Sequence, residues 1–596
     1  METKLNKKDF RIIVICILIA ALSLLFVIKY FYKAFPEASI DFKVTRVQSR
    51  TIAEAFLQKI HFDDKDYRHS VIFDYDSQAK TFLEKELGAE KANTLMGSTI
   101  RLWWWSNRWY KPLQKEEVSV HVSPSGDFIA FDHLIPEEAA GASLPADSAK
   151  SFALDFLTRT MGLKISDLEF VEKTSQQRPK RTDHTFIWKK KGFEIRDATY
   201  RYKVQILGDQ VGAYFEYLHV PEKWQRDYQK LRAKNNTTAN VSFFFLFLTL
   251  FAMLVMLIVY TRHRDIRWRT AAWFGIVAAV LTFLSYLNDL PVTFYNYATT
   301  DPLSGFILRE IVIDLVNALL SGAGIFFLTA AAEPLYRERY KNQLSFTRML
   351  SWRGLRTKKS FIAILVGLTM TIGFAAYQVV FYLTSQKLGG WAPQDIPYDN
   401  LLNTAFPWIS VLLIGFMPAV TEEFISRMFS IPFFEKFIKV RWLSVIIPAF
   451  IWGFAHANYP NQPFYIRGLE VGTTGIIVGI IMLRFGILAT LVWHYTVDAF
   501  YTALVLLRSG NPYFISTAAI GGSIMLLPLL IALVAYVKNK SFSPETELTN
   551  EAEGTSRLSE PKSKVPETNV PLYQWLSWKR IAAGFVISLL LFAFYF

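Results

Sequence analysis

Apolar runs of about 20 residues recur along this chain, and no other feature limits its possible folds so strongly. A helix needs about 20 apolar residues to cross the hydrocarbon core of a bilayer, so each run is a candidate membrane span. Hydrophobic residues make up 52% of the 596 residues, whereas charged residues make up only 19%. The sequence therefore predicts an all-α polytopic membrane protein rather than one large soluble core.

The predicted spans number about eleven when an N-terminal membrane anchor (residues 1–33) and a C-terminal transmembrane helix (residues 581–596) are added to the internal runs. The lipid bilayer is thus the first expected partner. The internal candidates are Val241–Tyr260, Ala271–Leu287, Ile311–Ala331, Phe361–Leu383, Ala405–Arg427, Leu443–His456, Gly468–Leu483, Ile487–Leu507 and Phe514–Val537.

Basic residues lie mostly between the apolar runs, where Lys and Arg set membrane orientation. The connections TRHRDIRWR, YRERYKNQ, RMLSWRGLRTKK and KFIKVRW all fall on one side, which we assign to the cytoplasm. The N-terminal run lacks the short apolar region and the small-residue cleavage site of a signal peptide. We expect a multi-pass protein of the cell membrane with a cytoplasmic N-terminus. The positions of the Lys and Arg residues in this topology account for the net charge of +14, so no nucleic-acid partner is expected.

Residues 34–238 are mixed in character and rich in turn residues, which predicts an extracytoplasmic α+β domain. The single cysteine, Cys16, excludes an intramolecular disulfide, so this domain must be held by its own core. The segments SRTIAEAFLQKI and DSAKSFALDFLTRT resemble each other, and each precedes strand-like sequence, which indicates a duplicated unit. The stretch LWWWSNRWY predicts a strand in an aromatic core, with an exposed ligand platform as the alternative. The ligand of this domain is unknown.

Three further regions complete the predicted organisation. Residues 239–360 would add transmembrane helices, and residues 361–537 would form the helical domain that carries the candidate site. Residues 538–580 are rich in Ser, Thr, Pro and Glu, which is typical of a disordered linker, here on the cytoplasmic side.

Charged side chains inside a span are costly and suggest a functional site. The stretch TEEFISRMF contains Glu422, Glu423 and Arg427 at the end of an apolar run. Glu423 and Arg427 are four residues apart, so they share a helix face and can form an ion pair. Glu422 points about 100° away around the helix and has no local partner. A purely structural interpretation explains the pair but not Glu422.

Two other spans carry imidazole groups. His456 ends the segment FIWGFAH, and His494 lies four residues before Asp498, so that this pair shares a helix face. Counted at about 1.5 Å per residue, Glu422, His456 and His494 all lie roughly 15–22 Å from the cytoplasmic rim. Charged residues near other span starts are interpreted as interfacial caps: Arg309, Glu310, Asp314, Arg467 and Glu470.

A carboxylate and two imidazoles at one depth are sufficient to activate water for peptide hydrolysis. The same groups could bind Zn²⁺, since two His and a carboxylate are a familiar ligand set. The chain has no HExxH motif, and we favour a site without metal or other cofactor. If the protein depends on a metal, its ligands would be Glu422, His456 and His494.

At these residues the chain resembles the CPBP family, which comprises the type II CAAX prenyl endopeptidases and their bacteriocin-processing and Abi-type relatives. The family pattern is EExxxR, then FxxxH, then HxxxN or, less often, HxxxD, on separate transmembrane helices. Here the motifs read EEFISR, WGFAH and HYTVD, in the same order. The resemblance covers roughly residues 361–537 and does not extend to the external domain.

The resemblance implies an intramembrane endopeptidase that hydrolyses a membrane-associated protein or peptide. Its implied catalytic residues are Glu422, His456, His494 and Asp498, and its implied support residues are Glu423 and Arg427. In this assignment Glu422 activates water, His456 assists, and His494 with Asp498 stands where the family stabilises the oxyanion. The substrate is expected to arrive from the membrane or from the cytoplasmic side.

Two departures from the family pattern affect these expectations. Trp452 replaces the usual Phe, which is expected only to reshape packing. Asp498 stands where Asn is commoner, and an ionised Asp cannot donate a hydrogen bond to an oxyanion. Asp498 must therefore be protonated or act by orienting His494.

Two alternatives to a protease remain open at this point. A non-catalytic regulatory or immunity protein could use the same scaffold, with the buried charges only holding helices together. A proton-coupled transporter is the third hypothesis, but the membrane region shows no paired repeats with interrupted helices.

Overall fold

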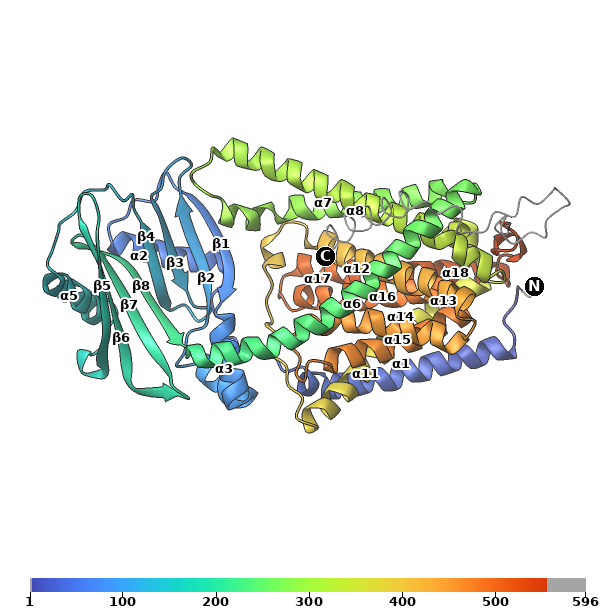
Figure 1. Ribbon diagram of the computed structural model, residues 1–596, viewed down its shortest axis with the longest axis horizontal. Helices are drawn as coiled ribbons and strands as arrows, with labels where there is room; N and C mark the ends of the chain where they lie inside the picture. The colour runs from blue at the N-terminus through green and yellow to red at the C-terminus, as the bar shows by residue number, and fades with distance from the viewer. Residues whose placement is uncertain (1–2, 555–596) are drawn as a thin grey trace.

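The computed structural model describes residues 3–554, which form a sheet domain and a helical bundle (Figure 1). The predicted C-terminal helix at residues 581–596 and the linker beyond residue 554 lie outside the described residues. The polytopic helical core with an N-terminal domain is confirmed. We call the end of the bundle next to the sheet the domain end. The opposite end, where the N-terminus lies, is the far end.

The sheet domain holds one antiparallel sheet of eight strands in the order β1-β2-β3-β4-β8-β7-β6-β5. Each half of the domain supplies one long helix and four strands, and the halves join where β4 pairs with β8. The elements are α2 (Arg46–Lys59), β1 (Arg68–Tyr75), α3 (Ser77–Leu87), α4 (Ala89–Met96), β2 (Trp103–Tyr110), β3 (Glu117–Val122), β4 (Phe128–Leu134), α5 (Ala146–Asp155), β5 (Leu168–Gln177), β6 (Thr182–Ile195), β7 (Ala198–Leu207) and β8 (Gln210–His219).

The tryptophan-rich stretch forms β2, as expected for a strand in an aromatic core. Successive side chains of a strand point to opposite faces, so Trp103, Trp105 and Trp109 all face the core and are buried. Trp104 lies on the other face, where its ring stacks on His121 with centroids 5.2 Å apart. Burial there lowers the pKa of His121 to about 4. Three of the four tryptophans thus serve packing.

The bundle contains eight helices in the described residues that are long and apolar enough to cross a membrane, or nine if the bent pair α17–α18 is one span. The main bundle helices are α1 (Lys7–Ala34), α6 (Glu222–Arg262), α7 (Trp268–Thr293), α8 (Leu303–Arg339), α11 (Lys358–Lys387), α12 (Pro407–Glu423), α13 (Ser430–Phe437), α14 (Arg441–Ala455), α15 (Ile466–Phe485), α16 (Ile487–Leu507), α17 (Pro512–Gly522) and α18 (Leu526–Asn539).

Two predicted spans differ from simple membrane-crossing helices. The candidate Leu443–His456 is α14, whose 15 residues are short for a span because the chain turns at His456. The candidate Phe514–Val537 is broken by 61° between α17 and α18. The break consists of Ser523, Ile524 and Met525 and follows Gly521 and Gly522 at the end of α17, where glycine disfavours continuation of the helix.

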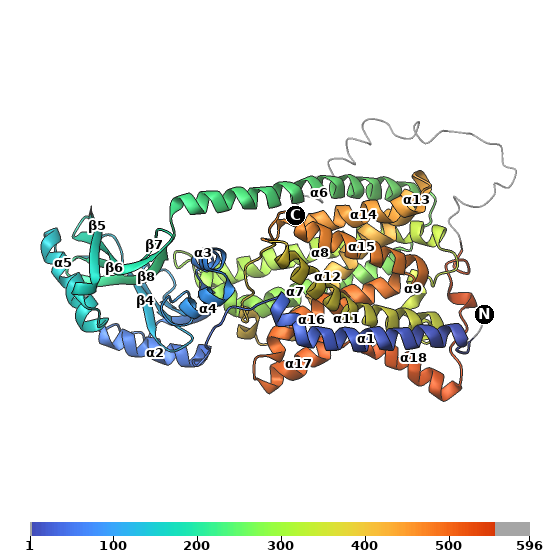
Figure 2. The ribbon, with the colours of Figure 1, turned by 90° about the horizontal axis from the view of Figure 1, so that it is seen from below.

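Helix α6 joins the two parts of the molecule without interruption. This helix of 41 residues starts beside the sheet and continues along the bundle (Figure 2). The predicted boundary between residues 238 and 239 therefore falls inside a helix, because nothing between Glu222 and Arg262 is a Gly or Pro that would end it. Its Asn235 is buried and donates to the backbone oxygens of Ala457 and Tyr459 at 2.9 and 3.0 Å. Helix α6 thus contacts the loop that follows His456.

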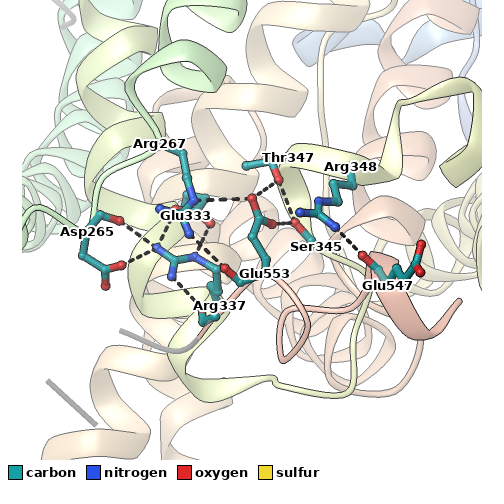
Figure 3. A network of polar contacts seen from close by, with 10 residues as sticks. Asp265, Arg267, Glu333, Arg337, Ser345, Thr347, Arg348, Glu547 and Glu553 are labelled. Carbon is teal, nitrogen blue, oxygen red and sulfur yellow. Dashed lines mark hydrogen bonds and ion pairs between the residues drawn. The ribbon is translucent and has the colours of Figure 1, made fainter. Parts of the chain in front are cut away.

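Residues 540–554, which we call the C-terminal strap, are ordered, so the prediction of a disordered linker at residues 538–580 is wrong for the part that the structure describes. Glu553 accepts hydrogen bonds from Ser345 and Thr347 and forms an ion pair with Arg267 (Figure 3). The backbone oxygen of Gly554 accepts from buried Arg337 at 2.9 Å. Composition suggested disorder here, but these contacts to hydroxyl and guanidinium groups of the far end order the strap.

Candidate active site

The acidic motif lies where α12 changes its winding. α12 ends at Glu423 and continues directly into a π-helical segment, Phe424–Phe429. Such segments are rare and frequently occur at functional sites. Glu423 and Arg427 lie on either side of the change, and their side chains meet at 3.0 Å. The ion pair inferred from the sequence is therefore present in the fold.

Glu423 has a second partner that sequence reasoning missed. Its Oε1 lies 2.9 Å from Nδ1 of His494 as well as 3.0 Å from Arg427. Glu423 and Arg427 are 0% and 1% exposed. A buried carboxylate between a guanidinium and an imidazole is electrostatically compensated. Glu423 therefore fixes the ring of His494 rather than holding Glu422.

Glu422 faces the other way, into a space shared with two imidazoles. Its Oε2 lies 3.9 Å from Nε2 of His456 and 3.6 Å from Nε2 of His494. Three separate helical elements thus bring together the groups that the sequence placed at one depth. The side chain of Glu422 is 27% exposed, in contrast to its buried neighbour Glu423.

Trp452 does more than fill space, which corrects the expectation for this departure from the family pattern. Its indole Nε1 donates a hydrogen bond to Oε2 of Glu422. The guanidinium of Arg427 lies over its ring, 3.9 Å from the centroid. The backbone oxygen of Trp452 lies 2.9 Å from Nδ1 of His456. Trp452 therefore contacts Glu422 and Arg427 through its side chain and His456 through its backbone.

Asp498 lies on the Nε2 side of His494, and its two expected roles, as a protonated donor or as a group that orients His494, stay predictions. Its Oδ2 lies 3.5 Å from Nε2 of His494, whereas Nδ1 is held by Glu423. With Nδ1–H donated to Glu423, Nε2 is directed toward Glu422 and Asp498. Its side chain is 27% exposed, so Asp498 borders the same open space as Glu422.

The site has a buried half and an open half. Every residue from Glu423 to Ser430 is buried, as are Ile487 to Thr490 at the start of α16. Glu422, His456 and Asp498 are instead partly exposed, with side-chain exposures of 27%, 22% and 27%. The residues toward the far end are therefore buried, whereas the side chains of Glu422, His456 and Asp498 border a partly open space.

The alternative zinc set of Glu422, His456 and His494 is not arranged as a metal site. Among residues 3–554, no group of three or more His, Cys, Asp or Glu side chains is placed to hold a metal ion. In addition, Oε2 of Glu422 already accepts the hydrogen bond from Trp452. A site without metal, which the sequence favours, stays a prediction.

The charged residues interpreted as caps divide into two cases. Arg309 pairs with Asp301 and Glu310 at the surface and takes part in none of the contacts above. Arg467 and Glu470 form a pair whose carboxylate is fully buried. Glu470 also accepts from Gln378, so this pair belongs to the interior of the bundle. Neither residue belongs to one of the three motifs, so the sequence gave no signal of that burial.

Comparison with known proteins agrees with this geometry. One curated relative is the sporulation-killing factor biosynthesis protein SkfC of Bacillus subtilis (strain 168), 21% identical over 224 residues. The match covers 37% of this chain and 42% of the relative, so the chain spans less than half of that protein's length. No solved structure matches. Residues 404–500, which contain all six proposed site residues, match the family of type II CAAX prenyl endopeptidases described as Rce1-like.

Proposed function

We propose that this protein is an intramembrane endopeptidase that hydrolyses a peptide bond of a membrane-associated protein or peptide. The observation that carries the proposal is the convergence of Glu422, His456 and His494 within 4 Å, with Glu423 and Arg427 buried behind them. Charged side chains with a purely structural role would be expected to form ion pairs, whereas Glu422 faces a partly open space. The family match over residues 404–500 supports the same chemistry.

Water activation would begin at Glu422. A water molecule held between its carboxylate and Nε2 of His456 is positioned to lose a proton to the carboxylate as its oxygen attacks the scissile carbonyl carbon. The hydrogen bond from Trp452 and the contact between His456 and the Trp452 backbone hold both groups in place. Orientation of this kind lowers the barrier because the reacting groups need no rearrangement.

The tetrahedral intermediate would carry its negative charge toward His494. Glu423 accepts from Nδ1–H, so Nε2 can donate to the oxyanion when His494 is an imidazolium with a proton on both ring nitrogens. Asp498, when protonated, can donate a second hydrogen bond. The proton taken up by Glu422 then passes to the leaving amine nitrogen as the C–N bond breaks, which restores the carboxylate.

The proposed location is the cell membrane, with the sheet domain outside the cytoplasm. The Lys- and Arg-rich connections lie at the far end of the bundle and the sheet at the other end (Figure 1). Because basic connections favour the cytoplasm, the far end is assigned to that side. No nucleic-acid partner is proposed.

The test is a peptidomic comparison of membranes from cells that contain the wild-type protein or Glu422→Gln at matched abundance. Gln keeps the size of Glu422 and still accepts from Trp452, but it cannot take up a proton. A membrane peptide cleaved only with the wild type is the expected result. Equal peptide profiles from two folded proteins would contradict the proposal and favour a regulatory scaffold without catalysis.

A further inference from the structure

A cavity of about 520 Å³ lies at the domain end of the bundle, next to the candidate site. Its volume falls within the range of ligand pockets in proteins. Its lining mixes aromatic, amide and charged side chains, among them Gln378, Tyr382, Tyr459, Arg467, Tyr501 and Arg508. A mixed lining of this kind suits a polypeptide, whose backbone needs polar partners, better than a hydrocarbon chain.

One face of α16 connects the reacting groups to this cavity. His494, Asp498, Tyr501, Val505 and Arg508 follow one another at intervals of three or four residues and so form one stripe. The last three line the cavity, and the first two belong to the site. At about 1.5 Å per residue the stripe is roughly 21 Å long, and the lining of the cavity begins at Tyr501, about one helical turn from Asp498.

The second histidine contacts a residue that lines the same cavity. His456 stacks on Tyr459, with ring centroids 6.4 Å apart, and Tyr459 lines the cavity. The guanidinium of Arg467 lies 4.9 Å from the centroid of the Tyr459 ring. The lining of the cavity therefore adjoins the site on two elements, α16 and the loop that follows α14.

The roof of the cavity is tied to the external domain. The loop of residues 391–397 supplies Trp391 and Asp395 to the lining. In this loop, the backbone oxygen of Gln394 accepts from Lys80 of α3, and its backbone N–H donates to Glu84 at 3.1 Å. Buried Lys80 and Glu84 form an ion pair at 2.9 Å. The sheet domain thus holds the roof in place over the site.

The opposite approach is closed. Residues 423–430 and 487–490, which separate the reacting groups from the far end, are all buried. The pair Arg508–Glu37 lies at the mouth of the cavity, and both side chains are about one quarter exposed. Water and a polypeptide can therefore reach Glu422 more readily from the domain end.

We propose that the substrate reaches the site through this cavity, as a polypeptide stretch next to its membrane anchor, on the side of the membrane where the sheet domain lies. This inference deepens the proposed function and differs from the expected approach through the membrane or the cytoplasmic side. The sheet domain acts as the frame of the access route. A substrate would cross beneath the 391–397 loop and extend along the α16 stripe.

Access can be tested without any substrate or activity. In a Cys16→Ala background, Asp498→Cys and His456→Cys each place a single thiol at the site, on different elements. Two exposed controls mark the sides: Lys91→Cys on the sheet domain and Trp352→Cys at the far end, where Trp352 is 65% exposed. A charged, membrane-impermeant thiol reagent is applied to sealed vesicles of each orientation.

The expected result is labelling of the site thiols from the side that labels Lys91→Cys. Val505→Trp, which narrows the cavity, should abolish or slow this labelling severalfold, whereas Phe500→Trp on the exposed face of the same helix should not. Labelling from the side of Trp352→Cys, or from neither side, would overturn the inference. Because labelling needs no turnover, its failure is distinguishable from a failure of the proposed hydrolysis.

Discussion

The indole nitrogen of Trp452 donates a hydrogen bond to the carboxylate of Glu422, and these residues come from different helices. The same indole lies beneath the guanidinium of Arg427. Trp452 therefore positions the proposed base through a contact that a phenylalanine cannot make. This relationship distinguishes a packing role from a positioning role for Trp452.

We expect Trp452→Phe to lower kcat about tenfold or more, with a much smaller effect on KM. A hydrogen bond to a charged group contributes about 1.5–3 kcal/mol, and each 1.4 kcal/mol corresponds to about a factor of ten in rate. The measurement is steady-state kinetics on the peptide that the comparison of the wild type with Glu422→Gln identifies as the substrate.

Trp493→Phe is the matched control for this change. Trp493 is buried like Trp452, but its Nε1 has no hydrogen-bond partner within the described part of the chain. The same substitution there removes no contact to the base and should leave kcat close to that of the wild type. Equal losses from both substitutions would show that Trp452 acts only through packing.

Glu423→Ala should destabilise the folded protein by about 3–5 kcal/mol, because it leaves the guanidinium of Arg427 buried without a carboxylate. Thermal unfolding in detergent and membrane abundance measure the effect. The double variant Glu423→Leu with Arg427→Met should recover much of the loss. Wild-type stability in Glu423→Ala would contradict the assigned support role.

Chelators are expected to leave peptide hydrolysis unchanged. The described residues contain no group of three or more His, Cys, Asp or Glu side chains placed to hold a metal ion. Activity after treatment with EDTA or 1,10-phenanthroline, followed by addition of Zn²⁺, checks this. Loss with chelator and return with zinc would favour metal ligation by Glu422, His456 and His494.

The strap should contribute to stability at the far end of the bundle. Glu553→Gln weakens the contacts to Ser345, Thr347 and Arg267, so the unfolding temperature should fall. Glu551→Gln is the control, since Glu551 is exposed and two residues away. An equal shift from both substitutions would mean that the strap acts through general charge alone.

The sheet domain should lose stability as the pH falls from about 6.5 to about 4. Burial lowers the pKa of His121 to about 4 in the folded state, whereas an unfolded chain has a histidine pKa of about 6.5. The unfolded state therefore binds the proton first, and folding stability falls across this interval. Intrinsic tryptophan fluorescence during urea unfolding at several pH values measures the trend. His121→Gln should flatten it, and an unchanged pH dependence in that variant would contradict the assignment.

The sequence alone determined the class of the molecule and the identity of the candidate site residues. Hydropathy is a local property, so runs near the length of a membrane span identify helices without knowledge of their neighbours. The spacing of Glu423 and Arg427 likewise follows from helix geometry, which is why their ion pair could be expected. The roles of these residues in catalysis stay predictions until the Glu422→Gln comparison is made.

Only the tertiary structure decided which groups meet across helices. Glu423 contacts His494, 71 positions away, and Trp452 contacts Glu422, 30 positions away. No periodicity encodes such contacts, because they depend on how α12, α14 and α16 pack. The order of the strap and the cavity beneath the sheet domain have the same origin. The composition of a segment reflects only its own residues, whereas its order and its contacts also depend on the residues that the fold places next to it.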